Sequence, residues 1–66
     1  MQLTVNGQSR EVPAGTDLPE LLALLGLRRG SVVVELNGTA LVPSEVPGTA
    51  LADGDRLELV RAVAGG

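Results

Sequence analysis

The chain has to build its whole hydrophobic core from aliphatic side chains. Its 66 residues include no phenylalanine, tyrosine, tryptophan or cysteine, so neither aromatic packing nor a disulfide stabilises the fold. A chain of this length lies near the lower limit at which a domain folds unaided. Nearly every leucine and valine therefore has to be buried. Little volume remains for an enclosed active site, which argues against an enzyme.

Composition and charge exclude several further classes of function. Histidine and cysteine are absent, and with them the commonest metal ligands and the commonest catalytic base. The net charge is −3, so the chain lacks the basic surface that binds nucleic acids or anionic membranes. Its apolar stretches are far shorter than the roughly 20 residues that cross a bilayer, and the N-terminus lacks a signal peptide's basic segment. We expect a cytoplasmic protein that is monomeric when free.

Hydrophobic alternation predicts a series of short strands around a single helix. Leu3 and Val5 alternate with polar residues, which is typical of a half-buried strand. Asn6-Gly7 then favours a tight hairpin turn, because both residues tolerate positive φ. Further strands are expected near 9–12, 32–36, 39–42 and 56–62, with an irregular connection over 43–50 and a turn over 52–55.

The predicted helix begins after Asp17, a favourable N-cap residue, and Glu20 completes a capping box with it. Leucines with spacing i, i+3, i+4 and i+7 form one apolar face. These are Leu18, Leu21, Leu22 and Leu25. Leu24 is expected to widen this face, and Gly26 to end the helix.

The order of these elements is compatible with an α+β fold of the β-grasp type, and also with other small α+β arrangements. A helix that follows a hairpin has to cover one face of the sheet, because a single layer cannot bury its apolar side. The first and last strands are both apolar enough to be central, and a long crossover allows them to lie parallel. We therefore expect one domain over 1–66, a mixed sheet of four to five strands with one main helix on one face.

The chain continues past its last predicted strand into Gly65-Gly66. A terminal diglycine alone is a weak signal, but here it is projected from a rigid strand. Glycine has no Cβ to obstruct an active-site channel. A carboxylate has a pKa near 3.5 and has to be activated before it reacts, and the chain has no phosphate-binding loop of its own. Because the chain has no cysteine, no side chain could hold sulfur as a persulfide. If the chain carried sulfur, it would have to be bound to the C-terminal carbonyl carbon as a thiocarboxylate.

Four stretches of the chain match one known family in order and spacing. They are 1–7 (MQLTVNG), 15–22 (GTDLPELL), 34–38 (VELNG) and 53–66 (DGDRLELVRAVAGG). Together they resemble ThiS, the sulfur carriers of bacterial thiamine biosynthesis, and the resemblance covers the whole chain. It implies the β-grasp fold of ubiquitin.

The resemblance also implies a reactive C-terminus. Gly66 would be adenylated by a ThiF-type enzyme and converted to a thiocarboxylate with sulfur from a cysteine desulfurase system. A ThiG-type thiazole synthase would then take the sulfur. ATP and Mg²⁺ would belong to the activating partner, with no cofactor bound by this chain. Gly65 would give clearance, while Val63 and Ala64 would pass through a partner's channel, so 63–66 form a flexible reactive tail.

By the same resemblance, one face of the sheet docks the activating enzyme and the synthase. Val33 and Val60 point away from the helix in the predicted strands. Arg61, Glu58 and Glu35 are candidate charges around them. Three alternatives stay open: a MoaD-like carrier for molybdopterin synthesis, a carrier for tRNA thiolation, and a ubiquitin-like interaction module with an inert tail.

Overall fold

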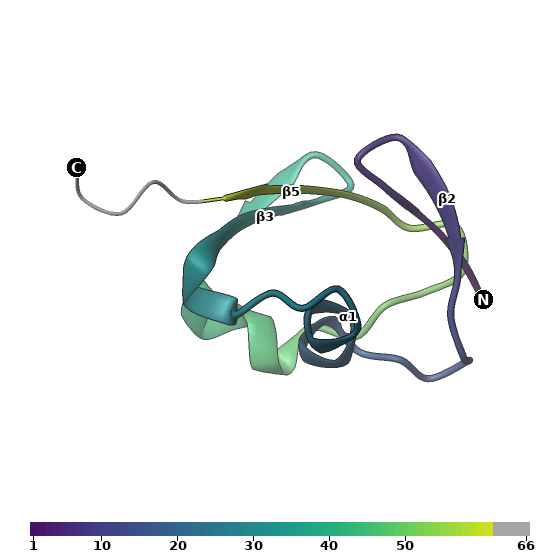
Figure 1. Ribbon diagram of the computed structural model, residues 1–66, viewed down its shortest axis with the longest axis horizontal. Coiled ribbons are helices and arrows are strands. Elements are labelled where there is room, and N and C mark those ends of the chain that lie inside the picture. The colour runs from purple at the N-terminus through teal and green to yellow at the C-terminus, as the bar shows by residue number, and fades with distance from the viewer. Residues whose placement is uncertain (62–66) are drawn as a thin grey trace.

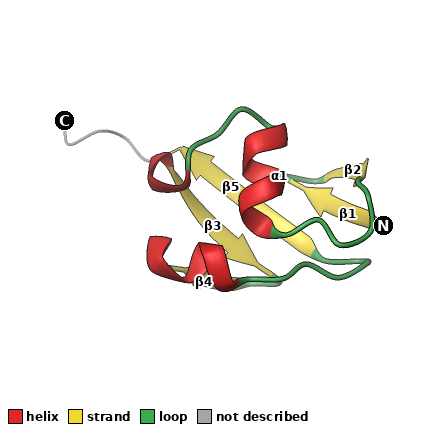
Figure 2. Ribbon diagram, turned by 90° about the horizontal axis from the view of Figure 1, so that it is seen from below, coloured by secondary structure: helices red, strands yellow, loops and turns green. Residues whose placement is uncertain are grey.

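Residues 1–61 form a five-stranded mixed sheet, with every helix of this range on one side of it (Figures 1 and 2). A computed structural model describes residues 1–61, apart from the side chain of Arg29. The elements in chain order are β1 (Gln2–Val5), β2 (Gln8–Glu11), α1 (Leu18–Leu24), the 3₁₀ helix η1 (Arg29–Ser31), β3 (Val32–Leu36), β4 (Thr39–Leu41), the 3₁₀ helix η2 (Pro43–Gly48) and β5 (Arg56–Arg61).

The strand order is β2-β1-β5-β3-β4. The central pair β1 and β5 is parallel, and every other pair is antiparallel. This confirms the predicted β-grasp topology with its central first and last strands. The predicted second strand was placed one residue too late, because β2 ends at Glu11. Val12 is buried and still exchanges backbone hydrogen bonds with Met1, at 2.9 and 2.7 Å.

Both predicted Asn-Gly turns are present, with positive φ at Asn6 (49°) and Asn37 (51°). The side chains of these asparagines also hold β5. Asn6 Oδ1 accepts from the Leu59 N–H at 2.7 Å, and Asn6 Nδ2 donates to the Leu59 carbonyl at 3.2 Å. Asn37 Oδ1 accepts from the Arg56 N–H at 2.9 Å. The two turns therefore position the last strand as well as joining their own hairpins.

The capping box at the start of α1 is confirmed. Asp17 Oδ1 accepts from the Glu20 N–H at 2.9 Å, and the Asp17 N–H donates to Glu20 Oε1 at 3.2 Å. The predicted apolar face packs onto the sheet, with Leu18, Leu21 and Leu22 fully buried and Leu25 partly buried. Leu57 of β5, which has no exposed surface, belongs to the same core.

The expectation for Leu24 was wrong, because this side chain is 66% exposed. At about 100° per residue, Leu24 lies roughly 110° away from the centre of the buried face. It points to the flank of the helix, where it lines a shallow groove together with Pro13 and Ala14.

The expectation of an irregular connection over 43–50 was also wrong, because most of it forms η2. Pro43 begins this helix with a φ that proline already favours. Glu45 Oε1 accepts from the Val42 N–H at 2.8 Å, and Val46 is buried in the core. The other 3₁₀ helix, η1, was not predicted from the sequence.

Candidate partner-docking surface

The strand β5 ends at the centre of the sheet, between β1 and β3. Four of the predicted functional residues, Val63, Ala64, Gly65 and Gly66, follow it and lie outside the described residues. The registers show how β5 is held. All of β3 pairs with it, from Leu36–Leu57 to Val32–Arg61, whereas β1 reaches only Arg56 and Leu57. The second half of β5 therefore has a strand on one side only.

The outer face of the sheet, opposite α1, carries the two predicted docking valines. Val33 and Val60 stand directly opposite each other across β3 and β5, and they are 48% and 60% exposed. Their neighbours Val32 and Leu59 are buried on the other face. The structure thus brings the two valines together on an open surface. Their role in docking remains a prediction.

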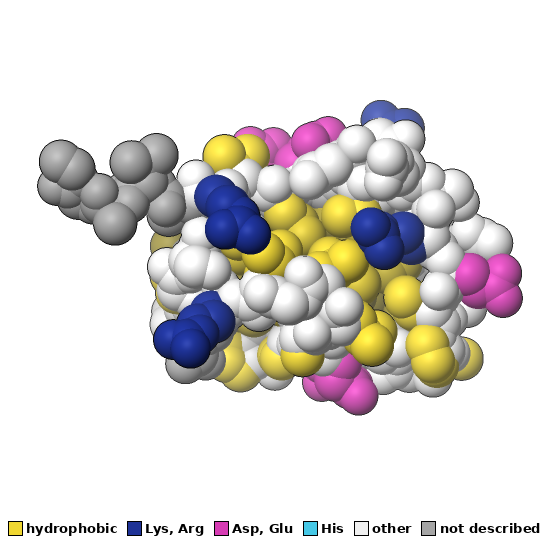
Figure 3. Space-filling model, viewed as in Figure 1, with side chains coloured by type: hydrophobic (Ala, Val, Ile, Leu, Met, Phe, Trp, Pro, Cys, Tyr) yellow, Lys and Arg dark blue, Asp and Glu magenta, His cyan; other side chains and the backbone are white. Residues whose placement is uncertain are grey.

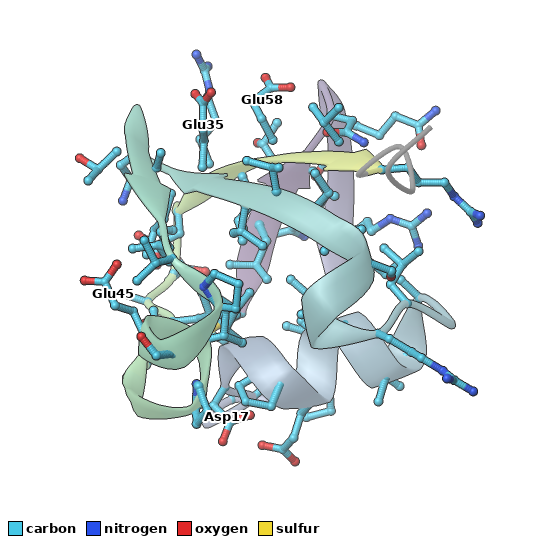
Figure 4. All side chains as sticks on the ribbon, turned by 90° about the vertical axis from the view of Figure 1, so that its left-hand side faces the viewer. Asp17, Glu35, Glu45 and Glu58 are labelled. Atoms are coloured by element: carbon cyan, nitrogen blue, oxygen red, sulfur yellow. The ribbon has the colours of Figure 1, made fainter. Side chains whose placement is uncertain are left out.

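The same face carries a pair of carboxylates. Glu35 and Glu58 are exposed and stand opposite each other, two positions along from the valine pair. Figure 4 shows both side chains pointing outward from the sheet side by side. Like charges directly opposite each other in a sheet destabilise it. We call Val33, Val60, Glu35 and Glu58 the outer surface.

Val42 was not among the predicted site residues, although it lies beside this surface. It directly follows β4, whose Leu41 pairs with Val34 on the buried side. Because side chains alternate along an extended chain, Val42 falls on the outer side, and it is 55% exposed. The strand predicted near 39–42 includes this residue, but no facing was predicted for it.

The structure separates Arg61 from the outer surface. Arg61 stands opposite the buried Val32, on the side of the sheet that α1 covers. There it lines a hollow of about 250 Å³ together with Arg10 of β2. Arg10 was not among the predicted site residues. Every residue of β2 is polar, so the sequence does not indicate which side chains of this strand face the helix.

The described residues present two exposed features, the outer surface and the hollow lined by Arg10 and Arg61. Within 1–61 no group of three or more acidic side chains is arranged to hold a metal ion. Nor is any helix of this part of the chain long and apolar enough to cross a membrane. What the arrangement provides is a rigid sheet whose last strand runs alongside an exposed, partly apolar surface.

These features define a small ubiquitin-like β-grasp domain with an exposed, partly apolar surface beside its last strand. Comparison with known proteins gives the family. The ThiS family model matches residues 3–66, and the chain belongs to the ThiS family, which takes part in thiamine biosynthesis.

Solved structures agree with this assignment. The crystal structure of the thiamine biosynthesis protein ThiS from Geobacter metallireducens superposes with a TM-score of 0.83, at 36% identity and with both chains fully covered. A solution structure of a thiamine biosynthesis protein from the same organism gives a TM-score of 0.78 at 35% identity, covering all of this chain and 88% of the other.

A curated relative links the chain to a longer protein. All of this chain is 36% identical, over 66 residues, to part of a protein of Paramagnetospirillum magneticum named thiazole synthase. The match covers 20% of that relative's length.

Proposed function

We propose that this protein is a sulfur carrier for thiazole formation in thiamine biosynthesis. A ThiF-type enzyme adenylates the carboxylate of Gly66, sulfur from a cysteine desulfurase system replaces the AMP, and the resulting thiocarboxylate gives up its sulfur to a thiazole synthase. The observation that carries this proposal is the ThiS family match, which runs through the diglycine to residue 66.

The chemistry explains why the chain acts as a co-substrate. The carboxylate of Gly66 is an anion at neutral pH and resists attack. Its oxygen attacks the α-phosphate of ATP and expels pyrophosphate, which gives a mixed anhydride. The terminal sulfur of the desulfurase's persulfide then attacks the carbonyl carbon and expels AMP, which gives an acyl disulfide. A thiol reductant cleaves its S–S bond and releases the thiocarboxylate, while the reductant becomes a disulfide. ATP and Mg²⁺ are bound by the activating enzyme, and Gly65 adds no side chain that would obstruct the attack.

The outer surface supports a docking role. Val33 and Val60 form an exposed apolar pair on a rigid sheet, beside the strand that leads to the tail. An enzyme that covers these valines is held where Val63 and Ala64 lead the chain into its active site. Small side chains at these two positions suit a narrow channel.

The thiazole synthase relative favours thiazole as the destination of the sulfur. A segment similar to this whole chain occurs inside a polypeptide named thiazole synthase. Joining a carrier to its acceptor raises the effective concentration of one at the other. No comparable observation favours molybdopterin synthesis or tRNA thiolation.

Intact-mass spectrometry tests the proposal directly. The full chain is incubated with ATP, Mg²⁺, a ThiF-type enzyme, a cysteine desulfurase, cysteine and a thiol reductant. We expect the mass to change by the replacement of one oxygen with one sulfur. Addition of a thiazole synthase and its other substrates should then return the carboxylate form. An unchanged mass of the wild-type chain would refute the proposal.

Deletion of Gly66 supplies the matched control. The shortened chain should fold normally, because glycine has no side chain to bury and the described core is built from residues between Leu3 and Leu59. We expect loading to fall below detection while the thermal melting curve stays unchanged. Sulfur incorporation into the shortened chain would show that Gly66 is not the carrier residue.

A further inference from the structure

The hollow next to the end of β5 has a structural cause. β1 stops pairing with β5 at the Val5–Leu57 pair, and the chain then turns away at Asn6. The helix α1 is only seven residues long and ends at Leu24, so it does not cover this corner of the sheet. A space of about 250 Å³ remains between the second half of β5, the β1–β2 hairpin and the segment after α1.

The floor of this hollow is apolar and its border is basic. Val5, Leu25, Leu27, Val32 and Leu59 line it, together with Asn6, Gln8 and two arginines, Arg10 and Arg61. Figure 3 shows hydrophobic side chains gathered in a recess between β5 and α1, with arginine side chains at its border. We call this site the arginine hollow.

Neither arginine of the hollow is neutralised within the described part of the chain. The side-chain hydrogen bonds of residues 1–61 use amide, hydroxyl and carboxylate groups and no guanidinium. No described carboxylate lies within 4.0 Å of either guanidinium. In a protein with a net charge of −3, two cations thus face one apolar recess without a counter-ion among residues 1–61. Guanidinium groups favour planar, bidentate contacts with carboxylates.

We propose that the arginine hollow binds an acidic segment of the enzyme that processes the tail, with one apolar side chain in the recess and neighbouring carboxylates on Arg10 and Arg61. The inference rests on the proposed function in one respect, namely that a protein takes up the chain beyond Arg61. Such a partner follows β5 to its end and so passes the hollow, which Arg61 itself lines. This continuity favours a protein segment over a free small molecule.

The two faces of the sheet then make opposite electrostatic demands on the partner. The outer surface presents Glu35 and Glu58 beside its valines, whereas the hollow presents Arg10 and Arg61. A partner that meets both has to carry basic groups on one side of β5 and acidic groups on the other. A reversed orientation would bring like charges together, so the arrangement selects one orientation of the domain.

Binding measurements with the intact chain test the inference. Calorimetry with a ThiF-type enzyme in the absence of ATP measures affinity without turnover. We expect Arg10→Gln and Arg61→Gln each to weaken binding about fivefold, which is the upper range for an exposed ion pair. Arg10→Glu should weaken it further, and Arg10→Lys should keep most of the affinity. High salt should reduce the differences between the variants.

Arg28→Gln is the matched control, since it removes the same charge from an exposed arginine outside the hollow. We expect it to bind like the wild-type chain. Wild-type affinity of Arg10→Glu would overturn the inference while the wild-type chain is still loaded with sulfur. Failure of the enzyme to bind and load the wild-type chain would instead overturn the proposed function and this inference together.

Discussion

Asn6 shows how one residue carries two structural tasks. Its positive φ makes the turn between β1 and β2, and its side-chain amide replaces the strand that β5 lacks on that side. The amide joins residues 53 positions apart in the sequence. A local Asn-Gly pattern predicts the turn, but no local pattern predicts which distant strand the amide will reach.

The substitution Asn6→Gly separates these two tasks. Glycine accepts the positive φ without strain, so the turn is kept and only the side-chain bonds to Leu59 are lost. We expect the free energy of unfolding to fall by about 1–3 kcal/mol, because the backbone groups of Leu59 lose their partners. Urea denaturation measures this change. An unchanged midpoint would mean that water replaces the amide without penalty.

The helix α1 illustrates what a pattern can predict at the scale of an element. Its capping box and its i, i+3, i+4 leucines depend on neighbours within one or two turns, and both are confirmed. The prediction for Leu24 was wrong because the width of the buried face depends on what packs against the helix. The sheet covers only one side of α1, and Leu24 lies outside that side.

Two alanine substitutions test which leucines of α1 are buried. Leu21→Ala leaves a cavity in the core and should lower the free energy of unfolding by about 2–5 kcal/mol. Leu24→Ala should change it by less than about 0.5 kcal/mol, since the side chain is 66% exposed. Both substitutions place the same residue in the same helix, so helix propensity is matched. Equal melting temperatures for the two variants would contradict the assigned buried face.

The strand pair β3–β5 carries a local conflict of charge. Glu35 and Glu58 stand opposite each other on the exposed face, where like charges repel. We expect Glu35→Gln to raise the free energy of unfolding by up to about 1 kcal/mol at low salt. Adding Glu58→Gln should gain less than it does alone, because the repulsion has already been removed. Strict additivity in this double-mutant cycle would show that the two carboxylates do not interact.

At the scale of the whole molecule, features set by residues close together in the sequence could be predicted, and features set by distant residues could not. The order of the strands and of α1, the two Asn-Gly turns and the outward-facing Val33 and Val60 follow from local patterns, and the structure confirms them. The arginine hollow could not be predicted, since Arg10 and Arg61 come from opposite ends of the sequence. Their shared position arises where β1 stops pairing with β5. The resemblance to ThiS supplied the topology that hydrophobic alternation alone left open.

The fold also separates the groups that stabilise it from those offered to a partner. The core lies between α1 and the sheet, whereas Val60 lies on the other side of the sheet and is 60% exposed. Val60→Asp should therefore leave the core packing intact and the chain folded, and should lower kcat/KM for adenylation about tenfold or more, the loss of roughly 1.4 kcal/mol of binding.

Leu24→Asp is the control for that substitution, because it places the same charge on an equally exposed aliphatic position on the helix side. We expect kcat/KM for adenylation to stay at the wild-type value in this variant. A general effect of added negative charge would lower kcat/KM equally in both variants. A loss confined to Val60→Asp requires direct contact with the outer surface. Wild-type kinetics for Val60→Asp would mean that the enzyme approaches the tail from elsewhere, and the outer surface would then have no part in docking.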